Sequence, residues 1–389
     1  MTPPDEQSTV KCRVGIGSDR DGLDGGTTPP VERGLLGWRI ERRPSTSRAW
    51  EAGALLLTLL AASVVSSLLI VSAGADIRES LRALMRGAFG SQNALLETLV
   101  QATPLIFTGL AVTVAFRGRI WNIGAEGQFF AGTIAAFWAA NAFSSLPPII
   151  LVPLIIIAGS LAGAFWGGIA GVLKARYGAS EVIVTVMLNF IVLRILSFLL
   201  SDAWQDPNSY FYQTALMPES SYLPRLLGRG RLHLGFVLSL VTAVVVYVVL
   251  WRTVLGYEIR AIGSSPTAAS YKGISVPVLT VVVLGVSGAI AGLAGVSELA
   301  GLHHRLRLDI STGYGFTGII IALLGRLHPA GVVVAAIFFG ALVNGSLAMQ
   351  IATGVPVALV QAIQGVTLIF LLTAEVLTHY RIRRVGAHG

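Results

Sequence analysis

The sequence predicts an all-α membrane protein that crosses the bilayer about ten times. Hydrophobic residues make up 54% of its 389 positions and charged residues only 12%, whereas soluble domains carry about 25% charged residues. The mean hydropathy is +0.73, and long apolar runs recur from residue 52 to residue 377. This composition disfavours a soluble enzyme, a secreted disulfide-rich protein and a nucleic-acid-binding module.

The first 50 residues differ from the rest because they are polar and almost balanced in charge. They hold eight basic and seven acidic residues, and such a segment buries too little apolar surface to fold alone. We expect residues 1–50 to form a disordered cytoplasmic extension and not a signal peptide, since the first apolar run comes too late. The single cysteine, Cys12, lies in this segment, which excludes an internal disulfide.

Ten apolar segments follow, and nine of them are long enough to cross a membrane as helices. About 20 apolar residues are needed to cross roughly 30 Å of hydrocarbon. The exception is Gly313–Gly325, with 13 residues. A half-length helix presents free N–H groups inside the membrane, and Gly313, Gly315 and Gly318 would let a backbone or a solute approach. The ten segments are 52–72, 94–116, 122–142, 148–173, 180–200, 234–251, 276–298, 313–325, 330–350 and 356–377.

Basic residues between the segments indicate the orientation. With the N-terminus inside, the inside loops and tail carry eleven basic residues and one acidic residue, while the outside loops carry eight basic and six acidic. Because basic loops stay on the cytoplasmic side, we expect both termini to be cytoplasmic. The transmembrane domain then covers residues 51–378 and a basic cytoplasmic tail covers 379–389. The formal net charge of +8 therefore reflects topology, and no nucleic-acid partner is expected.

Polar side chains interrupt several spans at helical spacing. Asn122 and Glu126 lie four residues apart, and Glu181 lies four residues before Thr185. Ionisable groups inside a membrane mark a solute pathway or a buried pair, whereas amides and carboxylates also join helices or reach the interface. Both interpretations stay open on spacing alone. The pathway candidates are Asn122, Glu126, Gln128, Glu181, Asn189 and Asn344.

The inside connection 251–275 has 25 residues, too many for a simple turn. Ser265 followed by Pro266 is a helix-start pattern, with the serine as N-cap and the proline at the first helical position. A short, exposed helix at the cytoplasmic face would suit docking to another protein. A plain connecting loop is the alternative.

Catalytic motifs are missing from the sequence. There is no GxxxxGK[ST] phosphate loop, HExxH, paired CxxC or GxSxG motif. The pair His303–His304 has no convincing partners for a metal. We therefore expect no enzyme activity and no cofactor in this chain, and ATP hydrolysis would need a separate protein.

Four segments resemble a known family. TPLIFTGLAVTVAFRGRIWNIGAEGQ (103–128) resembles the permease subunits of bacterial ABC importers for branched-chain amino acids, simple sugars and nucleosides. Its NIGAEGQ part looks most like the nucleoside branch, whose receptors are basic-membrane-protein-type lipoproteins. Further matches are EVIVTVMLNFI (181–191), LGYEIRAIGSSPTAASYKGISV (255–276) and GYGFTGIIIALLGRLHPAGVV (313–333). The resemblance covers roughly residues 94–377, and the N-terminal extension has no counterpart in it.

This resemblance implies the architecture of a Type II importer permease in the bacterial inner membrane. It implies a second, often non-identical permease subunit, an extracytoplasmic solute-binding lipoprotein and an ABC ATPase that holds ATP and Mg²⁺. It also identifies residues 255–276 as the segment that couples to the ATPase. The coupling residues that it suggests are Arg260, Gly263, Ala268, Ala269 and Gly273.

The function expected on these grounds is ATP-driven import of nucleosides or related sugar-like solutes. The alternative is an ATP-independent secondary transporter in which Glu126 or Glu181 carries protons. That alternative predicts uptake by this chain alone, sensitive to a proton uncoupler.

Overall fold

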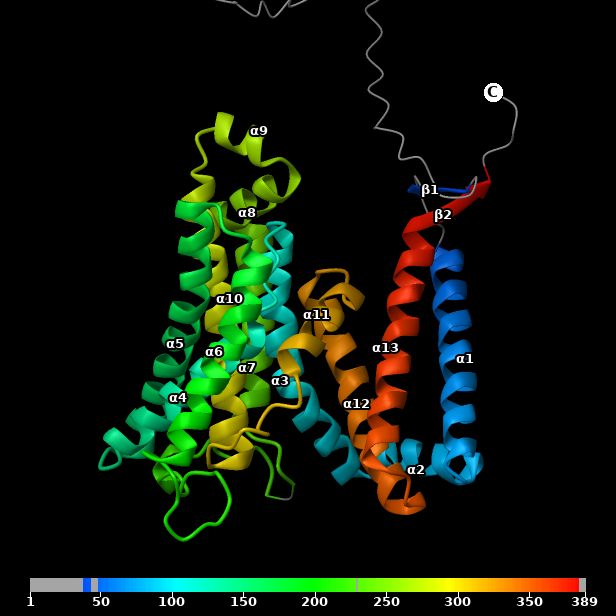
Figure 1. Ribbon diagram of the computed structural model, residues 1–389, viewed down its shortest axis with the longest axis horizontal. Coiled ribbons are helices and arrows are strands. Elements are labelled where there is room, and N and C mark those ends of the chain that lie inside the picture. Colours follow the sequence, from blue (N-terminus) through cyan, green and yellow to red (C-terminus); the bar gives the residue numbers. More distant parts are fainter. Residues whose placement is uncertain (1–37, 43–47, 229, 385–389) are drawn as a thin grey trace, which may run out of the picture. The chain divides into compact units, whose positions relative to one another are not determined.

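The computed structural model describes residues 38–42, 48–228 and 230–384, in two compact units. The helical unit covers Ser45–His379, and the other unit combines the two chain ends, Met1–Pro44 and Tyr380–Gly389 (Figure 1). Strand β1 (Trp38–Arg42) pairs antiparallel with β2 (Tyr380–Arg384), so that Ile40 lies opposite Ile382. In both strands, aromatic or Ile residues alternate with charged ones, which is the period-2 pattern of a strand.

This pairing differs from the expectation for the two chain ends. Most of the 1–50 extension, expected to be disordered, falls outside the described residues. Within it, residues 38–42 form β1 and residues 48–50 begin the first helix. In the expected basic tail 379–389, residues 380–384 form β2.

The helical unit contains a helix at each of the ten predicted apolar segments. In addition, α2, α8 and α9 are helices outside those segments. The helices are α1 (Arg48–Ser72), α2 (Ile77–Phe89), α3 (Gln92–Arg117), α4 (Ala125–Ala142), α5 (Pro148–Tyr177), α6 (Glu181–Ser201), α7 (Leu234–Arg252), α8 (Val254–Ser264), α9 (Pro266–Tyr271), α10 (Val276–Glu298), α11 (Tyr314–Leu324), α12 (Pro329–Thr353) and α13 (Val357–His379). A 3₁₀ turn, η2, spans Glu219–Ser221, and a π turn, η3 (Leu299–His303), extends α10.

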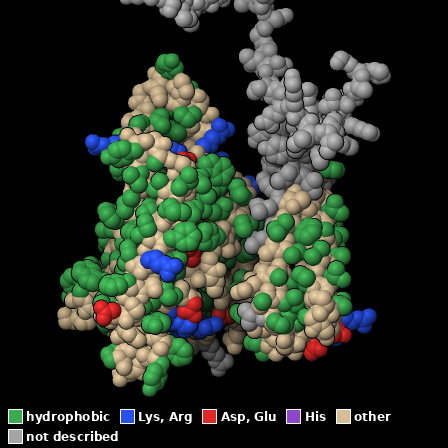
Figure 2. Space-filling model, viewed as in Figure 1, with side chains coloured by type: hydrophobic (Ala, Val, Ile, Leu, Met, Phe, Trp, Pro, Cys, Tyr) green, Lys and Arg blue, Asp and Glu red, His purple; other side chains and the backbone are tan. Residues whose placement is uncertain are grey.

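The structure supports a membrane protein but does not confirm ten crossings. Among the described residues, six helices are long and apolar enough to cross a membrane, or seven if the bent pair α1–α2 counts as one span. The six are α3, α5, α6, α7, α10 with η3, and α12. Helix α11 is shorter than a full span, as its sequence indicated. Hydrophobic side chains cover much of the visible helical surface, as contact with lipid requires (Figure 2).

Helix α3 lies at the centre of the helical unit. Its residues from Ala102 to Phe116 are all buried, and it contacts α7, α10, α11 and α12. Beside it, α5 packs closely on α10, because a side chain at Gly163 would overlap the carbonyl oxygen of Gly288. Small residues allow such close approach of helix backbones in membranes, so these glycines have a sufficient structural explanation.

The two ends of the helical unit carry different elements (Figure 1). Helices α8 and α9 lie at one end, beyond the last turn of α7. At the opposite end, α2 lies across the ends of its neighbours, next to the last turns of α12. On the orientation expected from sequence, the α8–α9 end is cytoplasmic.

Candidate functional site

A buried polar network surrounds the break between α3 and α4. Asn122 is fully buried, and its amide nitrogen donates to Gln128 Oε1 at 2.9 Å and to Ser287 Oγ at 2.8 Å. Its amide oxygen accepts the N–H of Gly124 at 2.9 Å. Ser287 on α10 donates in turn to the carbonyl oxygen of Ala111 on α3, at 2.6 Å. These bonds connect α3, α4 and α10.

Asn189 connects α6 to the same region. Its amide oxygen accepts the N–H of Gly127 at 2.7 Å, and its amide nitrogen donates to the carbonyl oxygen of Ile123 at 3.0 Å. A Cβ at Gly127 would lie 2.6 Å from that amide oxygen, so glycine allows the contact. Thr185, one turn earlier on α6, accepts the N–H of Ile123 at 3.3 Å.

Glu126 belongs to α4, and its carboxylate lies at the N-terminus of the half-length helix α11. Its carboxylate accepts the N–H of Gly315 at 2.7 Å and also bonds the Ser311 side chain. A carboxylate at a helix N-terminus is favoured because the free N–H groups there carry partial positive charge. The backbone of Glu126 also lies close to the start of α11. This contact requires glycine, because a side chain at Gly315 would overlap the backbone nitrogen of Glu126.

Two of the six pathway candidates form no hydrogen bond with the other four among the described residues. Glu181 begins α6 and pairs with Lys174 at the end of α5, with 2.6 Å between Oε1 and Nζ. Asn344 on α12 donates to the carbonyl oxygens of Gly87 at 2.8 Å and Ala94 at 3.0 Å. Asn344 thus joins α12 to α2 and α3. The members of the buried polar network are Asn122, Glu126, Gln128, Asn189 and Ser287.

Residues 255–276, which we name the coupling segment after the role that the resemblance implies, fold as two short helices. Ser265 caps α9 by accepting the N–H of Ala268 at 3.3 Å, and Pro266 occupies the first helical position, which confirms the helix start predicted from sequence. The segment borders a concavity of about 490 Å³ lined by Pro266, Thr267, Ser270, Tyr271 and Val276.

The five suggested coupling residues face in different directions. Ala268 and Gly273 are exposed. Ala269 is buried, and a side chain at Gly263 would overlap the carbonyl oxygen of Arg117 at the end of α3. Arg260 is half-buried, and its Nη1 atom has no hydrogen-bond partner among the described residues. Gly263 and Ala269 thus pack on the chain itself, while Ala268 and Gly273 remain accessible.

Sequence reasoning missed several polar residues of this unit. Ser287 and Ser311 were not singled out, because a serine in an apolar helix or loop gives no distinctive signal. Arg194 was also missed, although a charge inside the apolar segment 180–200 is a visible signal. It lies exposed on α6, between Ile191 and Ile195.

Comparison with known proteins identifies the family. The family model described as the permease component of the branched-chain amino acid transport system matches residues 94–372, which is more than half of the chain. The chain belongs to this permease family. Within the permease, the matched range begins in α3 and ends in α13, so it contains both the buried polar network and the coupling segment.

Curated relatives of the permease are subunits of ABC transporters. A glucose ABC transporter permease of Haloferax volcanii is 37% identical over 348 residues, covering 87% of this chain and 91% of the relative. A guanosine ABC transporter permease of Bacillus subtilis is 36% identical, covering 86% and 97%. A nucleoside ABC transporter permease of Lactococcus lactis subsp. cremoris is 34% identical, covering 74% and 81%. No solved structure matches this chain.

Proposed function

We propose that this permease is the membrane-spanning subunit of an ATP-driven importer for nucleosides or related sugar-like solutes. The proposal rests on the exposure of the coupling segment. This segment lies at one end of the helical unit and presents Ala268, Ser270 and Tyr271 to solvent. A separate ABC ATPase, which holds ATP and Mg²⁺, docks on this segment. The names of the relatives support both the transporter class and the solute class.

Movement of the docked ATPase would reach the interior through α8. Gly263 on α8 packs on the last turn of α3, at the carbonyl oxygen of Arg117. Helix α3 contacts α10, α11 and α12, so a displacement of the coupling segment is passed to the centre of the unit. ATP binding would draw the coupling segments together and change which side of the membrane the solute reaches.

The solute pathway in this proposal lies between this permease and a second permease subunit. The buried polar network supports that placement, because its amides and carboxylate already bond to atoms of the same chain. A solute-binding lipoprotein delivers the solute on the extracytoplasmic side of the bacterial inner membrane, and both chain termini are cytoplasmic. Binding of a panel of nucleosides and sugars to that lipoprotein would define the solute.

The secondary-transporter alternative is weaker on the geometry. A proton carrier needs a carboxylate that can exchange protons and partners during transport. Glu126 is held by Gly315 at the start of α11, and Glu181 is paired with Lys174. Both carboxylates therefore have structural partners.

The test compares two exposed tyrosines at the same end of the helical unit. Tyr271 belongs to the coupling segment and is 89% exposed, while Tyr177 ends α5 and is 70% exposed. In vesicles that contain the complete importer, Tyr271→Ala should lower ATP-driven guanosine uptake by about thirtyfold, since a buried interface tyrosine contributes about 2 kcal/mol. Tyr177→Ala should transport normally.

Two results would contradict the proposal. One is full ATP-driven uptake by the Tyr271→Ala variant, together with normal co-purification of the ATPase. The other is guanosine uptake by this chain alone that a proton uncoupler abolishes, which is the behaviour of a secondary transporter.

A further inference from the structure

Helix α2 has an exposed row of arginines. Arg78, Arg82 and Arg86 recur every four residues, so they follow one face of the helix. All three are exposed, and none forms an ion pair within the part of the chain that the structure describes. The N-cap, Asp76, uses its carboxylate to accept the backbone N–H groups of residues 78 and 79. The guanidinium groups thus have no direct ion-pair partner among the described residues, and the charge of Asp76 acts on Arg78 and Arg82 from farther away.

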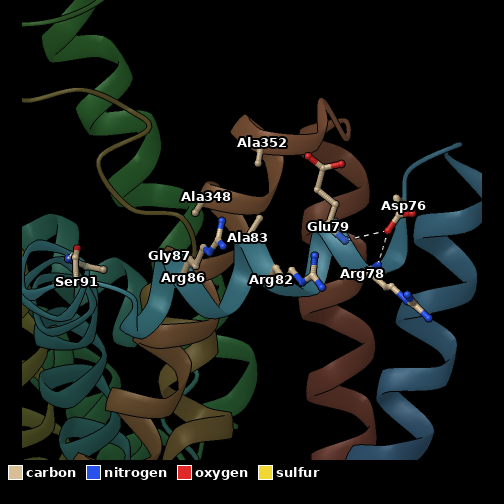
Figure 3. A pocket seen from close by; sticks show the side chains of 11 residues that line it. Asp76, Arg78, Glu79, Arg82, Ala83, Arg86, Gly87, Ser91, Ala348 and Ala352 are labelled. Atoms are coloured by element: carbon tan, nitrogen blue, oxygen red, sulfur yellow. Dashed lines mark hydrogen bonds between the residues drawn. The ribbon is translucent and has the colours of Figure 1, made fainter.

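The arginines border a cavity of about 800 Å³ between α2, the start of α3 and the end of α12. Figure 3 shows Arg82 and Arg86 one turn apart on α2, with Ser91 beyond Arg86. The acidic members of the wall, Asp76 and Glu79, lie toward the N-terminus of α2, before Arg82, whereas Arg86 and Ser91 lie after it. The cavity is therefore most positive between Arg82, Arg86 and Ser91. Small residues of α12, Ala348 and Ala352, complete the wall.

A second row on α2 is apolar and equally exposed. Leu81, Met85 and Phe89 also recur every four residues, and they are 47%, 56% and 51% exposed. The buried residues of α2, which include Ser80 and Ala83, lie on the side that packs on α12. A helix with adjacent basic and apolar rows binds at the boundary between headgroups and acyl chains.

The direction of α2 fits that boundary. The axes of α1 and α2 differ by 118°, so α2 runs within about 30° of the perpendicular to α1. Because α1 is aligned with the membrane-crossing helices, α2 lies close to the membrane plane at the end opposite α8 and α9. Its arginines can therefore meet phosphates while its apolar row meets lipid chains.

We propose that the cavity between Arg82, Arg86 and Ser91 binds the phosphate of an anionic phospholipid headgroup. Two guanidinium groups one turn apart offer paired N–H donors that match phosphate oxygens. The apolar row favours a lipid over the acidic surface of a partner protein. A protein that docks from water would not contact a row that faces the acyl chains, whereas a lipid would. The proposed transport function is not needed for this binding.

The experiment measures lipid retention by the full-length chain. The chain is reconstituted in mixed phosphatidylglycerol and phosphatidylcholine, extracted in detergent, and the retained lipids are counted by mass spectrometry. The double variant Arg82→Gln/Arg86→Gln should retain at least tenfold less phosphatidylglycerol, since each basic residue near an anionic surface contributes to binding. Arg82→Lys/Arg86→Lys should fall between, because lysine keeps the charge and loses the planar fork.

A matched control removes two arginines elsewhere on the chain. Arg225→Gln/Arg305→Gln changes the net charge equally, in the loops that follow α6 and η3, and should retain phosphatidylglycerol as the unmodified chain does. Thermal unfolding of each variant verifies that it is folded. Equal retention by the Arg82/Arg86 variant and the unmodified chain, or equal losses in both double variants, would overturn the proposal.

Two further outcomes distinguish other anions. Displacement of phosphatidylglycerol by millimolar inorganic phosphate would show a free-phosphate site and overturn the lipid assignment. If the Arg82/Arg86 variant retained phosphatidylglycerol but lost receptor-dependent uptake in phosphatidylcholine vesicles, the cavity would be assigned to an acidic protein instead.

Discussion

The buried polar network and the coupling segment both contain polar residues, but the two regions use them in opposite ways. In the network, Asn122, Glu126 and Asn189 bond to backbone and side-chain groups of neighbouring helices. In the coupling segment, Ala268 and Tyr271 face solvent and contribute little to packing. Polar side chains inside the membrane region thus hold this unit together, whereas the exposed residues at its end form a surface that a partner protein can contact.

The difference shows where substitutions should separate folding from transport. Substitutions in the network should mainly lower the free energy of unfolding, because buried groups would lose hydrogen-bond partners or overlap with neighbouring atoms. Changes at exposed positions of the coupling segment should leave that free energy nearly unchanged. The following substitutions test this contrast, in order of decreasing effect on stability.

The largest effect is expected from Gly315→Ala, which attacks the contact between α11 and α4. The new methyl group would overlap the backbone nitrogen of Glu126, and backbone atoms cannot move away as a flexible side chain can. We expect a loss of about 3 kcal/mol or more in the free energy of unfolding. Denaturant titration in detergent measures it.

Gly168→Ala on α5 is the matched control, because nothing lies within 4 Å of a Cβ there. That variant should be as stable as the original or up to about 1 kcal/mol more stable, since alanine favours helix. If both variants unfolded at the same denaturant concentration, the close contact at Gly315 would not stabilise this unit.

A second test uses a buried polar group that is only partly paired. His233 caps α7, with its Nδ1 accepting the N–H of Gly235 at 3.1 Å, while its Nε2 has no partner among the described residues. Burial, with a smaller contribution from the charge of His304, lowers the pKa of His233 from 6.5 to about 4. The unfolded chain therefore binds a proton between these two pH values that the folded chain does not.

The sign of the pH effect follows from that difference. The stabilisation is complete above pH 6.5 and is lost as the pH falls from about 6.5 to about 4, by up to about 3 kcal/mol. His233→Asn keeps a capping side chain without a titrating group, so its unfolding free energy should depend less on pH in this window. Equal pH dependence of the two proteins would refute the assignment. His304, whose pKa is also lowered, remains in both.

The sequence predicted the local features of this fold better than its long-range contacts. The ten apolar segments coincide with helices because hydropathy is a property of consecutive residues, and the start of α9 followed from Ser265 and Pro266. The bond between Glu126 and Gly315 joins residues 189 positions apart, and no pattern in either segment indicates it. The pairing of β1 with β2 joins opposite ends of the chain and was missed for the same reason.

The candidate site illustrates the same limit at the level of single side chains. Asn122, Glu126, Gln128 and Asn189 were identified from spacing and do lie together. Their spacing could not distinguish a solute pathway from a helix-joining network, because that depends on what the neighbouring helices offer. Likewise, the inward direction of Gly263 depends on the position of α3, which the sequence of α8 does not encode.

The smallest effect on stability is expected at Ala268, and its neighbour provides the control. Ala269 is buried against the unit, whereas Ala268 is exposed on the same short helix. Ala269→Leu should cost about 1 kcal/mol or more, because added methylenes must displace packed neighbours. Ala268→Leu should stay within about 0.5 kcal/mol of the original, as surface substitutions usually do, yet it should weaken co-purification of the ATPase. If Ala269→Leu weakened the ATPase complex while the unfolding free energy stayed unchanged, Ala269 would belong to the docking surface, and the contrast between the two regions would fail at this helix.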